Sequence, residues 1–370
     1  MPREHHGLTN NRSKEIVADH MTVELRFAQN NDAEEWNTLI AQSPHGTLFH
    51  TWNWLKITEK YTNSRLYPVI GINDNTPIGV FPLFFQEKGP LRMVFSPPPE
   101  THLPYLGPVM AKFNTLKQEK REINYIGFQT AIEYFLNQKL HSNYISISLS
   151  PDLQDLRPFT WSGYNTEPLY DYVTNLSIGW DTLLQNLDRK QRQNLNRAKK
   201  RGMVFEIGGK RELETILDFM EGRYALQKKF LRWPKDYFLA IYDAYKDNLK
   251  IFVAKVEGEI VSGSIDFQYR NVHYSWIGGP KPRNPISPSP NDFLIGESVR
   301  YATEQACRYY VLMSAASDKR LYAYYVTKFN PKLNIRYLVK KTSFLSALSE
   351  TGYMNIYKPL MGKFSHLLLT

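Results

Sequence analysis

The stretches VIGINDNTPIGVFPLFF (Val69–Phe85) and VAKVEGEIVSGSIDFQY (Val253–Tyr269) align without a gap at an offset of 184 residues in a chain of 370. Each predicts a β-hairpin, because β-branched and aromatic residues flank a polar turn, NDN at 73–75 and EGE at 257–259. A supersecondary pattern that recurs at half the chain length predicts two copies of one fold.

The elements after residue 202 read in the order β-α-α-β-β-β-α-β-α-β, which predicts a mixed α/β fold with helices on both faces of a central sheet. The first copy shows the same beginning, and a chain of this length is expected to form two domains. The predicted organisation is a disordered tail over 1–21, a first domain over 22–178, a second domain over 179–345 that opens with a basic helix over 180–201, and a C-terminal extension over 346–370.

The composition and net charge indicate which kinds of partner this protein could bind. The formal net charge is +10 and the sequence pI is near 9.3, which favours phosphate-bearing partners without choosing among them. The single cysteine, Cys307, excludes an internal disulfide, and the histidines show no ligand-like spacing, so we expect no metal site. A polar N-terminus without an apolar core and the absence of a long apolar run predict a cytoplasmic chain without a transmembrane segment.

The basic helix is the strongest charge feature. Arg189 to Arg201 holds seven Lys or Arg residues and no acid. At 100° per residue the apolar side chains, including Leu195 and Ala198, gather on one side and the cations cover the other. The basic side is either a solvated face or a site for a phosphate-bearing ligand. For such a site the predicted contacts are Arg189, Arg192, Arg197 and Lys200. Peripheral membrane contact stays open, and sequence-specific DNA binding is not expected, since no DNA-binding motif occurs.

Four stretches in this order resemble the FemABX-type branch, with the related BioF2-like domain, of the GCN5-related N-acetyltransferase (GNAT) superfamily. They are GTLFHTWNWLKITEKY from Gly46, LPYLGPVM from Leu103, LDRKQRQNLNRAKKRGM from Leu187 and LYAYYVTKFNPKL from Leu321. The resemblance covers 23–341 and implies two tandem GNAT-like domains, each with a central mixed β-sheet flanked by helices. It also implies an acyltransferase that uses aminoacyl-tRNA or acyl-CoA as donor and binds no cofactor permanently.

The resemblance suggests where chemistry would occur. Val326 stands at the position of a lysine that the family associates with catalysis, and Tyr325 precedes it; Lys328 is the nearest replacement. Asp266 lies within a predicted strand, where it either faces the cleft as a base or faces solvent. We therefore assign Asp266, Tyr325 and Lys328 as candidate catalytic residues.

Aromatic residues near the predicted joint of the copies are candidates for substrate contacts. These are Tyr105, Tyr274 and Trp276, although aromatic residues at such spacing also form cores. The first hypothesis is FemAB-like transfer of an acyl or aminoacyl group, from aminoacyl-tRNA in one version, to an amine of a cell-envelope or other phosphorylated precursor. The alternatives are an acetyl-CoA-dependent N-acetyltransferase and a catalytically inactive protein that binds phosphate-bearing ligands. The proline-rich segment GGPKPRNPISPSPND from Gly278 offers few backbone N–H groups for a CoA pyrophosphate.

Overall fold

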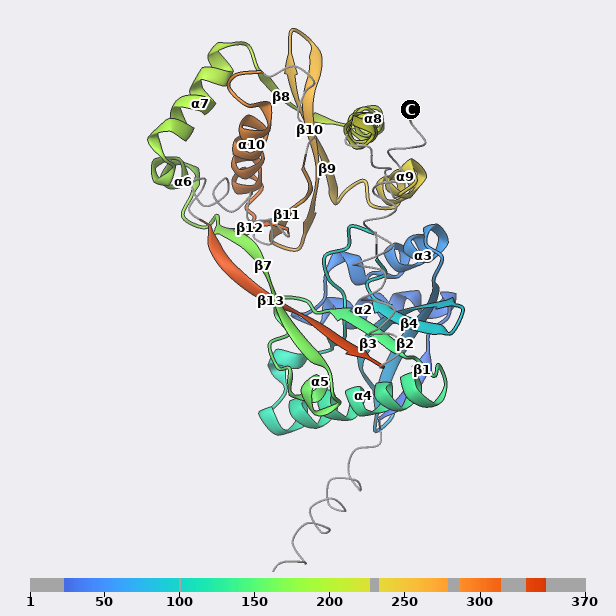
Figure 1. Cartoon of the computed structure of the whole chain (residues 1–370). Helices are drawn as coiled ribbons and strands as arrows, with labels where there is room; N and C mark the ends of the chain where they lie inside the picture. Colours follow the sequence, from blue (N-terminus) through green and yellow to red (C-terminus); the bar gives the residue numbers. More distant parts are fainter. Residues whose placement is uncertain (1–22, 100, 227–232, 279–285, 314–330, 344–370) are drawn as a thin grey trace, which may run out of the picture.

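A computed structural model describes residues 23–99, 101–226, 233–278, 286–313 and 331–343 (Figure 1). The first half contains β1 (Glu24–Phe27), α2 (Ala33–Ala41), α3 (Trp52–Tyr61), β2 (Arg65–Asn73), β3 (Thr76–Lys88), β4 (Leu91–Ser96), β5 (Val109–Met110), α4 (Gln118–Gln138), β6 (Tyr144–Ser148), α5 (Arg157–Trp161) and β7 (Asn165–Asn175), with short 3₁₀ turns at Asn30–Asp32, Leu48–His50 and Phe113–Thr115. The second half contains α6 (Trp180–Asn186), α7 (Arg189–Lys200), β8 (Val204–Gly208), α8 (Lys210–Leu226), α9 (Lys235–Ala244), β9 (Leu249–Val256), β10 (Glu259–Tyr269), β11 (Val272–Ile277), α10 (Pro290–Glu304), β12 (Tyr309–Leu312) and β13 (Lys332–Thr342).

The predicted repeat is present. Each half has a strand, two helices, a run of β-strands that starts with the hairpin, a long helix and two further strands, so the mixed α/β prediction is confirmed. The second helices correspond closely: α3 and α9 are each 10 residues long and begin at Trp52 and Lys235. The helices α6 and α7 have no counterpart in the first half, and they lie between the two copies along the chain.

Both hairpins close through the same tight turn. The two turn residues have positive φ in each case: 49° and 57° at Asp74 and Asn75, and 51° and 84° at Glu257 and Gly258. Two consecutive residues of this conformation define the type I′ turn, whose twist matches that of the flanking strands. This places the first copy's turn one residue out of register with the gapless sequence alignment. Because successive side chains of a strand point to opposite faces of the sheet, the gapless alignment matches residues that lie on opposite faces of the two hairpins.

The two halves exchange their last strands. The described strands form one 13-stranded sheet in the order β1-β2-β3-β4-β6-β13-β7-β12-β11-β10-β9-β8, with β5 beside β3. Thus β13 of the second half pairs with β6 of the first, and β7 of the first half pairs with β12 of the second. Figure 1 shows β7 and β13 running side by side from one lobe into the other. The predicted boundary at 178/179 falls between β7 and α6 in the sequence, while each lobe is completed by a strand of the other.

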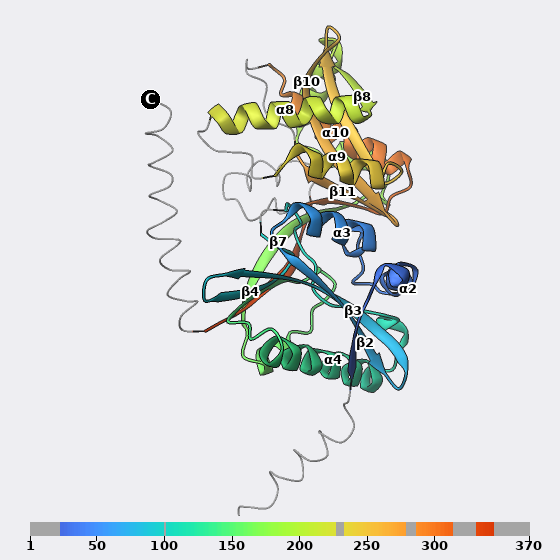
Figure 2. The same cartoon turned by 90° about the vertical axis from the view of Figure 1, so that its right-hand side faces the viewer.

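One apolar core is shared between the lobes. It joins side chains of α2 and α3 to side chains of α8 and α9, and Figure 2 shows α3 lying beneath α9. Phe49 and Trp54 of the first half are fully buried against Phe267 and Trp276 of the second, with ring centroids 4.9 Å apart for Phe49–Phe267 and 5.4 Å for Trp54–Trp276. Two further cores cover the other face of the sheet, one beneath α4 and α5 and one beneath α6, α7 and α10.

The helix expected over 180–201 is in fact two helices. Asp188 interrupts it, because its side chain accepts a hydrogen bond from the backbone N–H of Lys190 and so caps the N-terminus of α7. The amphipathic pattern itself is confirmed within α7. Gln191, Leu195 and Ala198 are buried, and the cations lie on the other side.

Candidate functional site

Trp276 lies in the core between the lobes. Its ring packs against Trp54 and Phe238, and its indole N–H donates to the carbonyl of His102 at 2.9 Å. Only 7% of the Trp276 surface is exposed. The side chain is therefore part of the core, which was one of the two roles that the sequence allowed.

Asp266 does not face solvent, since its exposed fraction is 0%. One carboxylate oxygen accepts from the Ser298 hydroxyl at 2.8 Å and lies 3.0 Å from Nε2 of His273, whose ring stacks on Tyr310. A base must meet the proton that it removes. Among the described residues, the contacts of Asp266 tie β10 and β11 to α10 inside the second lobe, and its catalytic role stays a prediction.

The cations of α7 divide into two groups. Lys199 pairs with Glu297 of α10 at 2.6 Å, and Arg192 donates to the carbonyl of Gln185, so these two hold the helix in place. The other predicted phosphate contacts are exposed, and their side chains make no hydrogen bond or ion pair with a residue that the structure describes: Arg189, Arg197 and Lys200. The structure thus leaves three of the four predicted contacts available on one surface.

Tyr105 and Tyr274, predicted from opposite halves, meet at the joint. The two hydroxyls act electrostatically on each other, and the Tyr274 ring stacks on Phe267 with ring centroids 4.6 Å apart. Burial raises the pKa of the Tyr105 and Tyr274 hydroxyls well above their usual value. Both hydroxyls therefore keep their protons at neutral pH.

A buried ion pair lies beneath these tyrosines. Arg336 of β13 donates to Asp171 of β7 at 3.1 Å, to the Ser148 hydroxyl at 2.9 Å and to the Pro104 carbonyl at 3.0 Å. Its guanidinium also lies 5.9 Å from the centre of the Tyr105 ring. The exchanged strands thus hold the Tyr105 loop against the sheet.

Sequence reasoning missed Asp152 and Arg270, which complete this group. Arg270, at the turn between β10 and β11, donates to the carbonyls of Ile40, Ala41 and Ser43 at 2.8–2.9 Å, where α2 of the other half ends. The Asp152 side chain is exposed, and its partial removal from water raises its pKa, a rise that the charge of Arg270 partly offsets. Asp152 and Arg270 both act electrostatically on Tyr274. The sequence signal that could have indicated Asp152 is its position in the loop just after the strand at 144–148.

We call the six residues gathered at the joint the junction cluster: Tyr105, Asp152, Asp171, Arg270, Tyr274 and Arg336. Three come from each half of the sequence.

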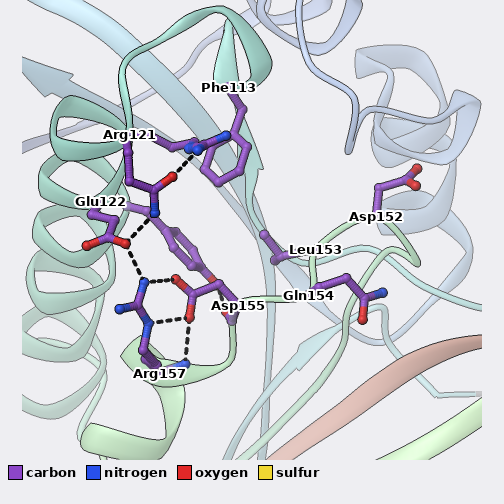
Figure 3. Close-up of a pocket in the computed structure, with 10 residues that line it drawn as sticks. Phe113, Arg121, Glu122, Asp152, Leu153, Gln154, Asp155 and Arg157 are labelled. Atoms are coloured by element: carbon purple, nitrogen blue, oxygen red, sulfur yellow. Dashed lines mark hydrogen bonds and ion pairs between the residues drawn. The ribbon is translucent and has the colours of Figure 1, made fainter.

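A cavity of about 390 Å³ in the first lobe lies next to this cluster. It is bounded by the start of α4, by Phe113 and by the loop after β6. Figure 3 shows one wall as a chain of hydrogen bonds from Arg121 to Asp155, and Asp152 on the opposite side, directed away from that wall. Asp152 borders the cavity and is the residue that the cavity lining shares with the junction cluster.

Tyr325 and Lys328 lie outside the described residues, and so do residues 279–285 of the proline-rich segment that begins at Gly278. None of the described helices is both long and apolar enough to cross a membrane.

Part of the sequence matches a known protein family, and the fold resembles solved structures. Residues 185–327 match the family described as acetyltransferase (GNAT) domain. The crystal structure of FemX superposes with a TM-score of 0.66 at 14% identity and covers 90% of this chain and 99% of that chain. L-PGS from Bacillus licheniformis gives 0.53 at 15% identity, covering 87% and 96%. A tandem GNAT protein from the clavulanic acid biosynthesis pathway gives 0.51 at 10% identity, covering 86% and 98%.

Comparison with curated proteins gave no match. At identities of 10–15% the structural likeness establishes the fold. The match over 185–327, the repeated order of elements and this likeness agree with one another. Residues 185–327 therefore match the GNAT acetyltransferase domain, and the chain as a whole shares the tandem fold of FemX and of the tandem GNAT protein.

Proposed function

We propose that this protein transfers an acyl or aminoacyl group to an amine, in the manner of FemAB-like enzymes, with aminoacyl-tRNA as the donor. The observation that carries the proposal is the superposition on FemX, which spans 90% of this chain, together with a surface of unpartnered cations on α7. The acceptor would be an amine of a cell-envelope or other phosphorylated precursor.

The junction cluster supplies what N-acyl transfer needs. The attacking amine must be neutral, and the tetrahedral intermediate needs a hydrogen-bond donor near its oxyanion. Protonated tyrosine hydroxyls and a carboxylate with a raised pKa stand at the joint of the two lobes. Binding both substrates there would supply the remaining rate by holding the amine and the carbonyl carbon in contact.

The donor is tested directly. Purified protein is incubated with radiolabelled aminoacyl-tRNA and a mixture of amine acceptors, and acid-stable label in the product is measured against uncatalysed hydrolysis. Transfer of the aminoacyl group is the expected result. Transfer from acetyl-CoA under the same conditions, with none from aminoacyl-tRNA, would replace the proposal by its first alternative.

That alternative rests on a separate observation. The family matched over 185–327 is described as an acetyltransferase domain, and the match includes the second-lobe sheet and α10. Calorimetric titration with acetyl-CoA distinguishes the two donors before any acceptor is known. If neither donor binds at millimolar concentration, a role confined to binding phosphate-bearing ligands is what remains.

The role of the exposed cations on α7 can be tested by charge reversal. Arg197→Glu with Lys200→Glu is expected to weaken tRNA binding at least tenfold and to lower the slope of log Kd against log salt by about 0.7–0.9 for each phosphate that the variant no longer neutralises. The free energy of unfolding should change by less than about 0.5 kcal/mol, because both side chains are exposed. Fluorescence anisotropy over a KCl series provides the measurement.

The matched control is Lys88→Glu with Lys139→Glu, which makes the same change in net charge at exposed positions of the first half. Equal weakening by both double variants would mean that only overall charge matters. It would remove α7 as the binding surface.

A further inference from the structure

The outer side of α7 carries a row of exposed polar side chains, which we call the outer stripe: Arg189, Gln193, Asn196, Arg197 and Lys200. At 100° per residue they fall within an arc of about 100°, directly opposite the buried side of the helix, and they extend over about 16 Å of its axis. None of these side chains makes a hydrogen bond or ion pair with a residue in the described ranges. The whole stripe is therefore available to a partner.

Other side chains of α7 hold the helix on the second lobe. Lys199 pairs with Glu297 of α10 at 2.6 Å. Leu195 packs so closely on Gly296 of α10 that a Cβ atom at Gly296 would lie 2.6 Å from it. Figure 1 shows α7 on the outer side of α10, which in turn packs on β9 and β10. The helix is thus fixed in place before any ligand binds, so ordering it would cost a ligand little binding energy.

The outer stripe has cations but no acid, unlike the exposed side of another helix in this chain. The exposed side of α8 mixes Arg211 with Asp218 and Glu221. In the outer stripe, Arg197 and Lys200 lie three residues apart on the helix, where like charges repel each other. An anion with several phosphates would neutralise these cations together and remove the repulsion. The charge pattern therefore favours a polyphosphate partner over bulk solvent.

Two amide side chains, Gln193 and Asn196, lie along the helix axis between Arg189 at one end of the outer stripe and Arg197 and Lys200 at the other. Each amide has an N–H donor and a carbonyl acceptor. A ribose 2′-hydroxyl also donates and accepts, and in an RNA duplex these hydroxyls line a wide, shallow minor groove bordered by phosphates. DNA has no such hydroxyl. A membrane surface is disfavoured because the stripe has no apolar side chain to enter the lipid interface.

We propose that the outer stripe binds the minor groove of an RNA duplex, with its cations on phosphates and with Gln193 and Asn196 on ribose 2′-hydroxyls. The inference rests on the proposed function, in which this duplex is a stem of the aminoacyl-tRNA donor. Phosphates and ribose hydroxyls are the same at every nucleotide, so the stripe distinguishes RNA from DNA without reading the base sequence.

Three hairpins of one sequence and length test the proposal on the full chain: RNA, 2′-O-methyl RNA and DNA. Their affinities are measured by fluorescence anisotropy at one KCl concentration. RNA is expected to bind about tenfold more tightly than either of the others, because 2′-O-methyl RNA keeps the phosphates and the A-form shape but loses the hydroxyl donor. Equal affinity for all three hairpins would overturn the proposal. Tighter binding to phosphatidylglycerol vesicles than to the RNA hairpin would replace it by a membrane role.

Two variants separate the amides from the cations. Gln193→Ala with Asn196→Ala is expected to reduce the preference for RNA over 2′-O-methyl RNA to less than about threefold and to leave the slope of log Kd against log salt unchanged, since no charge is removed. Arg189→Gln should lower that slope by about 0.7–0.9 and keep the preference. An unchanged preference in the double alanine variant would overturn the assignment of the amides.

The matched control is Asn137→Ala with Gln138→Ala, which removes the same two amides from exposed positions at the end of α4. This variant should bind all three hairpins as the wild type does, and an equal loss of RNA preference in it would overturn the proposal. The proposed function can fail separately. RNA preference without aminoacyl transfer would remove the donor assignment and keep the RNA surface, whereas transfer with equal hairpin affinities would do the reverse.

Discussion

Replacing Arg336 with alanine is expected to lower the free energy of unfolding by about 3–5 kcal/mol, because it removes one charge of a buried ion pair and leaves the other, on Asp171, in the interior. The arginine is 4% exposed and the aspartate 1%, so water cannot replace the lost hydrogen bonds. The same change also removes the donors to Ser148 and Pro104, which hold the Tyr105 loop. Urea unfolding followed by circular dichroism measures the loss.

Arg300→Ala is the matched control. Arg300 also pairs with carboxylates, Glu297 and Glu304, but its side chain is 43% exposed, and pairs of this kind contribute about 0–1 kcal/mol. The double variant Arg336→Met with Asp171→Leu should recover part of the loss, since it removes both charges together. A loss below about 1 kcal/mol for Arg336→Ala would show that the pair is not needed to join β7 to β13.

Cutting the chain between the halves is expected to leave one folded molecule, and separating the pieces is expected to destroy it. A protease site placed after Ile178, which is 44% exposed, would give fragments 1–178 and 179–370. Each fragment alone lacks the strand that the other contributes and exposes its side of the shared core, including Trp54 or Phe267. Such exposed apolar surface and open strand edges favour aggregation over folding.

Size-exclusion chromatography under native conditions checks the first part, in which the nicked halves should elute together at the mass of the 43.2 kDa chain. After separation in denaturant, refolding should fail for each fragment alone and succeed for the mixture. A protease site at the exposed hairpin tip around Gly89 is the control, since a cut there crosses no exchanged strand. Cooperative unfolding of either fragment by itself would contradict the prediction.

Features that depend on neighbouring residues could be predicted from the sequence. Polar turns between β-branched strands indicated both hairpins, and the spacing of Leu195 and Ala198 indicated which side of the basic helix is buried. These signals are local, since turn geometry and helical periodicity act over a few residues.

Asp266 and Asp152 show where local reasoning fails. In the sequence Asp266 stands within a strand and Asp152 in a loop, and strand alternation places the first on one face without saying what covers that face. The structure buries Asp266 under α10, which begins 24 residues later, and brings Asp152 toward Tyr274 from the opposite half. A carboxylate's environment is set by packing between distant segments, so its chemical role cannot be assigned from its neighbours in the chain.

The sequence by itself determined that this protein is two copies of a mixed α/β unit with a basic amphipathic helix between them, because periodicity and turn chemistry are encoded within each segment. Only the tertiary structure decided that the copies exchange their last strands, that they share one core, and that Asp152 and Arg270 face each other across the joint. Strand order and long-range burial depend on which surfaces meet after the elements have formed. That choice is a property of the whole chain.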